Sequence, residues 1–165
     1  MGDLFLLDLQ IEPVKGAAWG WGAAGNFPTA TNKQIGAGKW TAGPAGVYLK
    51  KDIPKTLIGI LAYNLWSYAG DSDRDDVNTF YFQPIVVRHT SWGYWGWTDQ
   101  TATIDWEHDN NITIPLGLRF GKVWKAKTPL KGEIGFYYNV TNNDRDSTYG
   151  LKITASFIKP HMLNH

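Results

Sequence analysis

Three features of the sequence predict an all-β chain that forms an antiparallel, up-and-down transmembrane β-barrel. Nine stretches alternate large apolar residues with small or polar ones, the links between them are alternately long and short, and aromatic residues gather near the ends of the stretches. Successive side chains of a strand lie on opposite faces, so each stretch would have one apolar and one polar face. This pattern, repeated along a chain with aromatic ends, is typical of transmembrane barrels. The 165 residues suffice for a single barrel domain, 1–165.

The alternating stretches are long for soluble strands. We expect strands at residues 3–12, 17–27, 40–50, 56–68, 77–88, 92–106, 112–124, 130–140 and 148–158. A tilted strand needs about 9–11 residues to cross a membrane, whereas soluble strands most often have about 5–6. The lengths therefore favour a barrel wall with about 8–9 strands in this chain. Single-chain bacterial barrels normally have an even number, so either the first stretch lies outside the wall or N-terminal strands of a larger barrel are missing.

The second stretch, 17–27, has a face made only of small residues, Ala18, Gly20, Gly22 and Ala24. A wall lined in this way leaves space inside the barrel. Either a ligand or large side chains from across the barrel would fill that space, and we favour the side chains.

The seventh stretch, 112–124, alternates most clearly. Its large apolar positions include Leu116, which we expect to face lipid near mid-membrane, while Gly117 faces inward. The inner positions of the last three stretches are predicted to line the lumen; the candidates are Arg119, Glu133, Lys152, Tyr137 and Asn139. Arg119, Glu133 and Lys152 would form a charge network that either selects solutes or fills the lumen as a structural cluster. The structural alternative is favoured, because barrels of about eight strands are normally filled by side chains.

The links between the stretches form two sets that differ in length and in charge. Residues 13–16, 51–55, 89–91 and 125–129 form short links, and residues 27–39, 69–76, 107–111 and 141–147 form mostly longer ones. The short-link end carries Lys15, Lys50, Lys51, Lys55, Arg88, Lys125, Lys127, Lys131 and Lys159, and the other end carries Asp71, Asp73, Asp75, Asp76, Glu107, Asp109, Asp144 and Asp146. Because outer-membrane barrels have short periplasmic turns and longer extracellular loops, we expect the basic end in the periplasm.

Aromatic residues near the strand ends suit the two membrane interfaces. They are Trp40, Trp66, Tyr68, Trp92, Tyr94, Trp106, Trp124, Tyr149 and Phe157. Trp and Tyr favour the headgroup level because one part of the side chain is apolar and another forms hydrogen bonds. The alternative is a soluble core rich in tryptophan, but a core would concentrate aromatic residues at strand centres.

Composition excludes several classes. The longest apolar run, 57–63, is far shorter than the about 20 residues of a spanning helix. Basic and acidic residues number 16 and 15, so the charge gives no case for binding nucleic acid. There is no cysteine, which fits an oxidising compartment. No signal peptide precedes the first strand pattern, so we expect a mature form, an engineered form or a fragment.

Nothing in the sequence predicts a cofactor or a metal. The acidic segment 71–76 lacks the glycine of a calcium loop, and Phe82 stands where the bidentate glutamate belongs; a solvated loop is the better account, with divalent bridging to lipopolysaccharide phosphates as an alternative. Asp105, Glu107 and His108 lie close together in the chain, as in some outer-membrane hydrolases. On a continuous strand Asp105 and Glu107 would share a face and His108 would point away, so we predict no catalytic residue and no enzyme.

Several motifs resemble one family. They are FPTAT at 27–31, GAGKWTAGP at 36–44, NLWSYAGD at 64–71, DVN at 76–78 with QP at 83–84, and DWE at 105–107. Together they resemble the bacterial outer-membrane transporter family described as "MetA-pathway of phenol degradation", often mislabelled neuromedin U, over about residues 2–160. The resemblance is to the C-terminal two-thirds of its members. It implies a porin-like barrel in the outer membrane of Gram-negative bacteria that moves hydrophobic or aromatic compounds.

The sequence therefore predicts an outer-membrane β-barrel that acts as a transporter or channel for small solutes. Its partners would be outer-membrane lipid and lipopolysaccharide, the solute and a second copy of the chain, with no nucleic acid. A soluble, lipocalin-like module that binds a small ligand is the alternative, and an outer-membrane hydrolase is the third hypothesis.

Overall fold

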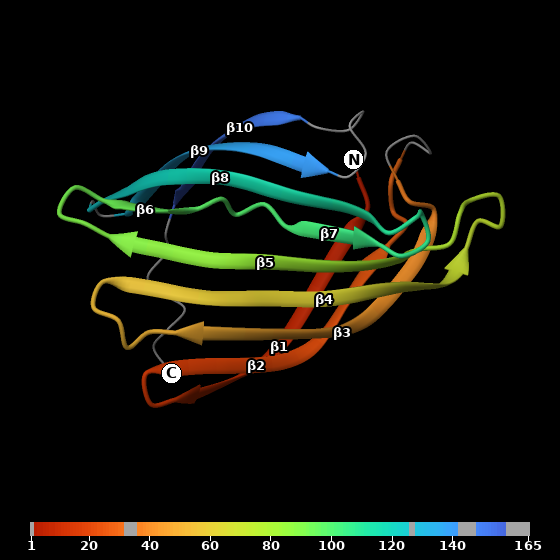
Figure 1. The fold of residues 1–165 in the computed structure, drawn as a ribbon, viewed down its shortest axis with the longest axis horizontal. Helices are drawn as coiled ribbons and strands as arrows, with labels where there is room; N and C mark the ends of the chain where they lie inside the picture. The colour runs from red at the N-terminus through yellow and green to blue at the C-terminus, as the bar shows by residue number, and fades with distance from the viewer. Residues whose placement is uncertain (1, 32–35, 126–127, 142–147, 158–165) are drawn as a thin grey trace.

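The computed structural model describes residues 2–31, 36–125, 128–141 and 148–157, and every regular element in this part of the chain is a β-strand. The strands are β1 (Leu4–Val14), β2 (Ala17–Phe27), β3 (Lys39–Lys50), β4 (Thr56–Gly70), β5 (Asn78–His89), β6 (Tyr94–Trp97), β7 (Ala102–Asp105), β8 (Asn111–Trp124), β9 (Leu130–Thr141) and β10 (Tyr149–Phe157) (Figure 1). The predicted all-β class is confirmed. Lys127, Lys159, Asp144 and Asp146, to which the sequence assigned an end of the barrel, lie outside the described residues.

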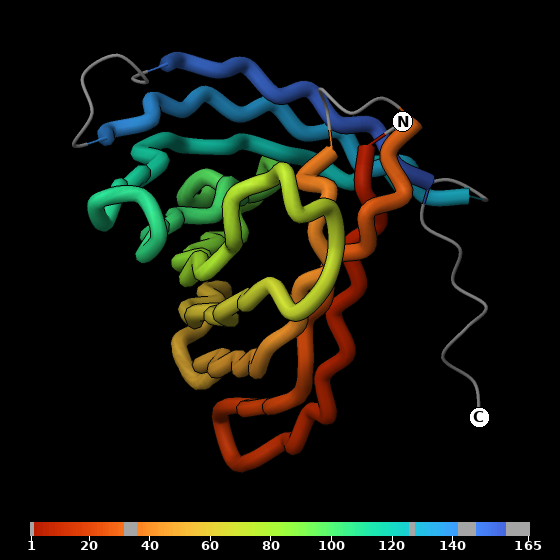
Figure 2. The backbone as a smooth tube through the Cα atoms, turned by 90° about the vertical axis from the view of Figure 1, so that its right-hand side faces the viewer, coloured from red at the N-terminus to blue at the C-terminus, as the bar shows by residue number. Residues whose placement is uncertain are grey.

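The strands form a single antiparallel sheet in the order β1-β2-β3-β4-β5-β6-β8-β9-β10, with β7 paired to β5 and β8. Apart from β6 and β7, which share one place between β5 and β8, neighbours in this sheet are also neighbours in the chain, so successive links lie at opposite ends, as predicted. The sheet is strongly coiled: β1 and β2 run at a steep angle to β8, β9 and β10 (Figure 2). Within the described residues, β1 pairs only with β2 and β10 only with β9.

One predicted strand, 92–106, is wrong as a continuous element. The chain leaves the ladder at 98–101, and the two short strands on either side, β6 and β7, occupy the same place between β5 and β8. The interruption leaves residues 83–86 of β5 and 114–117 of β8 without ladder partners on this side. Pro84 and Pro115 lie in these two segments. Since proline has no N–H to donate, both residues suit a site where the ladder is broken.

Inner glycines permit the tight coiling. A Cβ atom on Gly43 would collide with the backbone oxygen of Asn64, and a Cβ on Gly117 with that of Phe136. Adjacent strands therefore approach each other at these positions more closely than any side chain would allow. Glycines at such points are a recognised means of bending a sheet.

The two faces of the sheet differ as the alternation predicts. Along β8, Leu116 is 44% exposed on the outer, convex face, and Gly117 lies on the more buried inner face. On β2, Trp19 and Trp21 are exposed outward, and Ala18 is buried inward. Large apolar residues on the outer face continue across the sheet through Tyr48, Ile58, Ile60, Trp66, Trp95, Leu118, Phe120, Ile134, Phe136, Tyr138, Leu151 and Ile153.

Strand β1 is an exception to this pattern. Its outer positions, paired with Trp19, Trp21 and Ala23 of β2, are Glu12, Gln10 and Asp8. The outer apolar face thus extends over β2 to β10, and on the first strand it is interrupted at mid-strand, with Leu4, Leu6 and Val14 exposed toward the strand ends. β1 pairs with β2 along its whole length. The two alternatives for the first stretch, a strand outside the wall or missing N-terminal strands, stay predictions.

The inner face has an apolar part and a polar part. On the β1–β5 side, Ala24, Ala45 and Leu65 form a buried cluster, against which Leu7, Leu9, Tyr63 and Tyr81 pack. The space above Gly20 is taken by Ile11 of β1 and Val47 of β3. The small face of β2 is therefore covered by large side chains of the adjacent strands β1 and β3 and of β4 and β5. The expected contribution of side chains from across a barrel stays a prediction.

Candidate functional site: a polar cluster on the inner face

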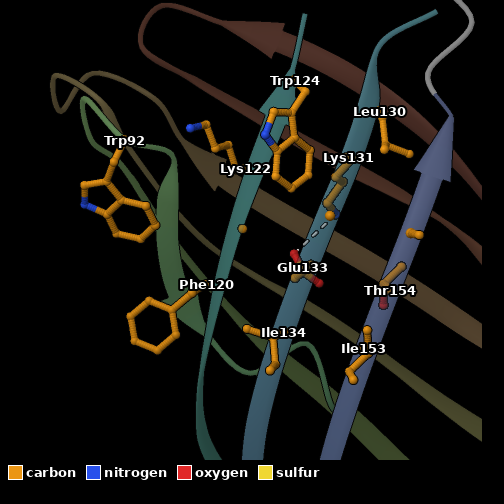
Figure 3. A pocket seen from close by; sticks show the side chains of 13 residues that line it. Trp92, Phe120, Lys122, Trp124, Leu130, Lys131, Glu133, Ile134, Ile153 and Thr154 are labelled. Carbon is orange, nitrogen blue, oxygen red and sulfur yellow. Dashed lines mark ion pairs between the residues drawn. The ribbon is translucent and has the colours of Figure 1, made fainter.

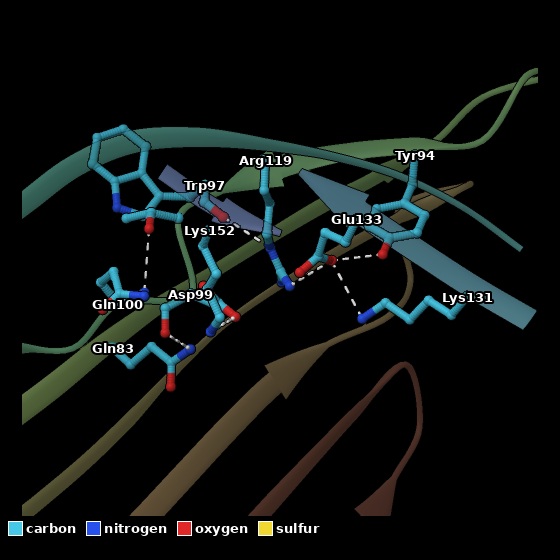
Figure 4. Close-up of polar contacts among 10 residues, drawn as sticks. Gln83, Tyr94, Trp97, Asp99, Gln100, Arg119, Lys131, Glu133 and Lys152 are labelled. Carbon is cyan, nitrogen blue, oxygen red and sulfur yellow. Dashed lines mark hydrogen bonds and ion pairs between the residues drawn. The ribbon is translucent and has the colours of Figure 1, made fainter. Parts of the chain in front are cut away.

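Glu133 of β9 is the centre of the polar part of the inner face. Its side chain is only 5% exposed, and its Oε2 atom accepts hydrogen bonds from the Tyr94 hydroxyl at 2.6 Å and from Arg119 Nη1 at 3.2 Å (Figure 4). Lys131 Nζ lies 3.3 Å from the same oxygen. A buried charge is tolerated when it is paired and hydrogen-bonded, and here donors from β6, β8 and β9 meet it. These contacts join three strands on the inner face.

Arg119 links this cluster to the interruption between β6 and β7. Its Nε donates to the backbone oxygen of Trp97 at 3.0 Å, while Nη1 contacts Glu133. Trp97 is the last residue before the chain leaves the ladder. The guanidinium therefore satisfies a carbonyl group at the break as well as the carboxylate, a double use that its fixed fork of donors allows.

Lys152 does not join the network in the predicted way. Its Nζ lies 2.8 Å from Asp99 Oδ2 instead of contacting Glu133. Asp99 belongs to the interruption at 98–101, and its backbone oxygen accepts a hydrogen bond from Gln83 Nε2 at 3.1 Å. Because a continuous strand was predicted there, the inward carboxylate of Asp99 was missed. The inner face thus carries two neighbouring ion-pair groups instead of one (Figure 4).

Tyr137 and Asn139, the other two candidates, are also half-buried on the inner face of β9. A Cβ on Gly150 would fall on the ring of Tyr137, so this ring covers the glycine of the neighbouring strand. Asn139 Nδ2 donates to Thr148 Oγ1 at 3.1 Å near the end of the hairpin. Tyr137 therefore lines the inner surface, and Asn139 secures the start of β10.

Tyr94 had been placed with the interfacial aromatic residues, and that placement is wrong. Tyr94 is 7% exposed and points inward, over Gly121 of β8, to Glu133. Its neighbour Trp95 is the exposed aromatic residue of β6. The alternation of faces along the strand distinguishes the two residues, because Tyr94 pairs with the inward Gly121 and Trp95 with the outward Phe120.

The acidic and histidine residues near the longer links form a second polar region. His108 Nδ1 lies 2.9 Å from Asp105 Oδ2, and Nε2 lies 3.5 Å from Asp75 Oδ2. The hydrogen bond that the imidazole donates to the Asp105 carboxylate raises the pKa of His108 above its usual value of 6.5. The predicted separation of His108 from Asp105 is wrong, since β7 ends at Asp105 and residues 106–110 form a turn in which strand alternation does not apply.

The acidic segment 71–76 is held by protein groups. Asp76 Oδ1 accepts hydrogen bonds from Lys39 Nζ at 2.9 Å and from the Ser67 hydroxyl at 3.2 Å, and these bonds lower the pKa of Asp76. The backbone N–H of Asp73 donates to Asp71 Oδ1 at 3.0 Å. In the described residues, no group of three or more histidine, aspartate or glutamate side chains is arranged to hold a metal ion.

No protein-family model, curated protein or solved structure matches this chain. Across the described ranges, no helix has the length and hydropathy needed to traverse a bilayer.

Proposed function

We propose that this chain forms a β-barrel, or most of one, in the bacterial outer membrane and that it passes or binds small solutes. The observation that carries the proposal is the inversion of the usual burial pattern. Large side chains such as Trp21, Leu116 and Phe136 are exposed on the outer face, whereas Glu133 and Arg119 are withdrawn on the inner one. An apolar surface of this extent on a soluble protein normally marks an interaction site, and lipid is the partner that would cover several adjacent strands at once.

Strand length supports the same proposal. Apart from β6 and β7, which share one place in the sheet, the strands have 9–15 residues. A tilted strand needs about 9–11 residues to cross a bilayer. Closure of the sheet, by β1 and β10 or by further strands, would remove its two free edges, which are otherwise sites of aggregation.

The inner face suggests which solutes would fit. Leu7, Leu9, Tyr63 and Tyr81 give it an apolar side, and Arg119 with its partners gives it a charged side. Binding pockets that combine apolar walls with a few placed polar groups orient molecules that have both kinds of surface. We therefore propose solutes with a hydrophobic or aromatic part and a polar group, in agreement with the family resemblance of the motifs.

Two measurements test the proposal: whether the chain needs detergent to stay in solution, and whether it speeds the passage of a solute across a vesicle membrane. The chain should require detergent to stay monodisperse, and vesicles that contain it should release an entrapped aromatic acid faster than vesicles without it. A chain that is monodisperse in plain buffer would refute the membrane assignment. It would favour the alternative, a soluble binding module built on the apolar cluster around Ala24, Ala45 and Leu65.

The third candidate, an outer-membrane hydrolase, depends on the pairing of His108 with Asp105. Lipid or peptide hydrolysis that is lost in Asp105→Asn would favour it. The pair is exposed on a turn, with Asp75 rather than a nucleophile on the other imidazole nitrogen, so the geometry favours a structural role.

A further inference from the structure

A groove of about 500 Å³ lies on the outer face of β8, β9 and β10, near the short-link end (Figure 3). Its floor is one row across the three strands, in which Gly132 of β9 pairs with Lys122 on one side and with Ala155 on the other. The rows on either side are large: Phe120, Ile134 and Ile153 form one, and Trp124, Leu130 and Phe157 form the other. Small residues between two rows of large ones produce the groove.

The side chains of the two walls rest against their neighbours. A Cβ on Gly132 would lie 2.7 Å from the Trp124 ring, so the indole already rests against the glycine. On the other side, the Trp92 ring lies 6.3 Å from that of Phe120, between centroids. The walls are therefore packed aromatic and aliphatic side chains, and the floor is open to the outside of the barrel.

One cation stands at the end of this apolar row. Lys122 is exposed on the outer face, and Figure 3 shows its side chain between the rings of Trp92 and Trp124. Glu133 is the one carboxylate among the described residues that line the groove, and it points inward and is already bound by Tyr94, Arg119 and Lys131. Among the described residues no ion pair of Lys122 is found. An apolar groove that ends in an unpaired cation between two indoles is complementary to a molecule with a long apolar tail and an anionic head.

We propose that the groove binds an anionic phospholipid, with an acyl chain along Gly132 and Ala155 and the phosphate group at Lys122. This inference rests on the proposed membrane location. The link between β8 and β9 is short, which assigns this end to the periplasmic side, where a lysine two residues from the strand end extends to the headgroup level. Because barrel strands tilt by about 35–45°, a groove across them is inclined to the membrane plane and admits a chain that descends from the headgroups.

Quenching of tryptophan fluorescence by brominated lipids tests the site. The full chain is placed in phosphatidylcholine vesicles that contain either dibrominated phosphatidylglycerol or dibrominated phosphatidylcholine, and the share of Trp124 is obtained by comparison with Trp124→Phe. We expect the anionic lipid to bind about fivefold more tightly, the factor that corresponds to about 1 kcal/mol for one lysine near a membrane surface. Lys122→Gln should bring this preference close to one.

Two further variants distinguish the contribution of the lipid headgroup to binding from that of the apolar groove. Lys50→Gln removes an outward lysine at the same end of the sheet, on β3, and should leave the preference at Trp124 unchanged. Ala155→Leu fills the floor on β10 and should weaken quenching of Trp124 by both brominated lipids.

Three results would overturn the inference. The first is equal quenching by both lipids in the unchanged chain, and the second is an equal loss of preference in Lys50→Gln. The third is quenching by neither lipid together with a concentration-dependent dimer, which would assign the groove to a second copy. A chain that does not float with the vesicles would instead refute the proposed function, so the two failures are distinguishable.

Discussion

At the scale of single residues, Glu133 shows how the inner face tolerates charge. Its buried carboxylate receives a hydroxyl, a guanidinium and an ammonium group, each from a different position in the sheet. Asp99, by contrast, has one lysine partner, and both side chains of that pair are partly exposed at 24% and 44%. The two ion pairs are close together on the inner face, but they differ in how far water screens them.

This difference predicts unequal costs of mutation. Glu133→Gln leaves Arg119 and Lys131 without their carboxylate at a buried site, which should lower the free energy of unfolding by about 3–5 kcal/mol. The control Asp99→Asn breaks an ion pair that is screened by solvent and should cost about 1 kcal/mol or less. Urea unfolding in detergent micelles measures both values. Equal losses in the two variants would show that Glu133 is not the centre of the cluster.

His108 gives a prediction for pH. Its pKa in the folded chain is raised above 6.5, mainly by the hydrogen bond to Asp105, and a raised histidine pKa means that the protonated form is stabilised by folding. The contribution to stability is thus fully present below pH 6.5 and is lost as the pH rises through the folded pKa. In an NMR titration of the imidazole, Asp105→Asn should lower the pKa of His108 toward 6.5. An unchanged titration would contradict the observed pairing.

At the scale of elements, alternation was sufficient to find most strands but not the break in the sheet. Strands such as β2, β8 and β9 were predicted within about two residues, because large apolar residues recur on one face of each and mostly small or polar residues on the other. Residues 98–101 contain neither glycine nor proline, so no local signal ended the predicted strand 92–106. The signal lay in the two neighbouring strands, as Pro84 and Pro115, and it has meaning only when the pairing is known.

The prediction of the candidate site was limited for the same reason, because it used only the alternation of residues along each strand. Strand parity correctly put Arg119, Glu133 and Lys152 on one face. It could not reveal Asp99 as the partner of Lys152, because the break turns Asp99 inward. It also put His108 on the face opposite Asp105, because the alternation of a strand was applied to residues that form a turn. Errors therefore arose where the chain leaves the regular strand, and polar side chains concentrate at those places.

Strand β8 gives the sharpest test of the two faces. Leu116 is exposed on the outer face, halfway along a 14-residue strand. If that face meets lipid, Leu116→Arg should destabilise the chain in bilayers by about 2–4 kcal/mol, the cost of an arginine at the midplane. Leu116→Phe keeps an apolar side chain and should be nearly neutral. Folding of the two variants into liposomes can be compared by their heat-modifiable mobility on gels. Equal folding of both variants would contradict the membrane assignment.

At the scale of the whole molecule, the meander places successive links at opposite ends of the sheet, and the proposed membrane location would put these ends on opposite sides of the outer membrane. Residues 51 and 73 lie in links at opposite ends of the sheet, at the β3–β4 and β4–β5 connections. Single cysteines can replace Lys51 and Asp73 in a chain that has no native cysteine. On intact cells, an impermeant thiol reagent should label position 73 and should reach position 51 only after the outer membrane is opened. Labelling of 51 alone would invert the orientation.

If the sheet closes as proposed, the charges on its inner face determine which ions its lumen conducts. Arg119 and Lys152 contribute two positive charges to the inner face, each held against a carboxylate on a neighbouring element. Charged groups that line a narrow passage favour ions of opposite sign. In a conducting barrel, the double variant Arg119→Gln, Lys152→Gln should therefore shift selectivity toward cations, because Glu133 and Asp99 remain.

The same double variant has a different effect in a barrel filled by side chains. Glu133 would keep Lys131 and Tyr94 but lose its guanidinium, so the unfolding midpoint should fall while no current is seen in either protein. Planar-bilayer recordings and urea unfolding of the unchanged chain and the double variant distinguish the two cases. Absence of current with a lowered midpoint would refute a pore formed by this chain alone. It would make the cluster a structural plug, and transport would then require the plug to move or further strands to widen the wall.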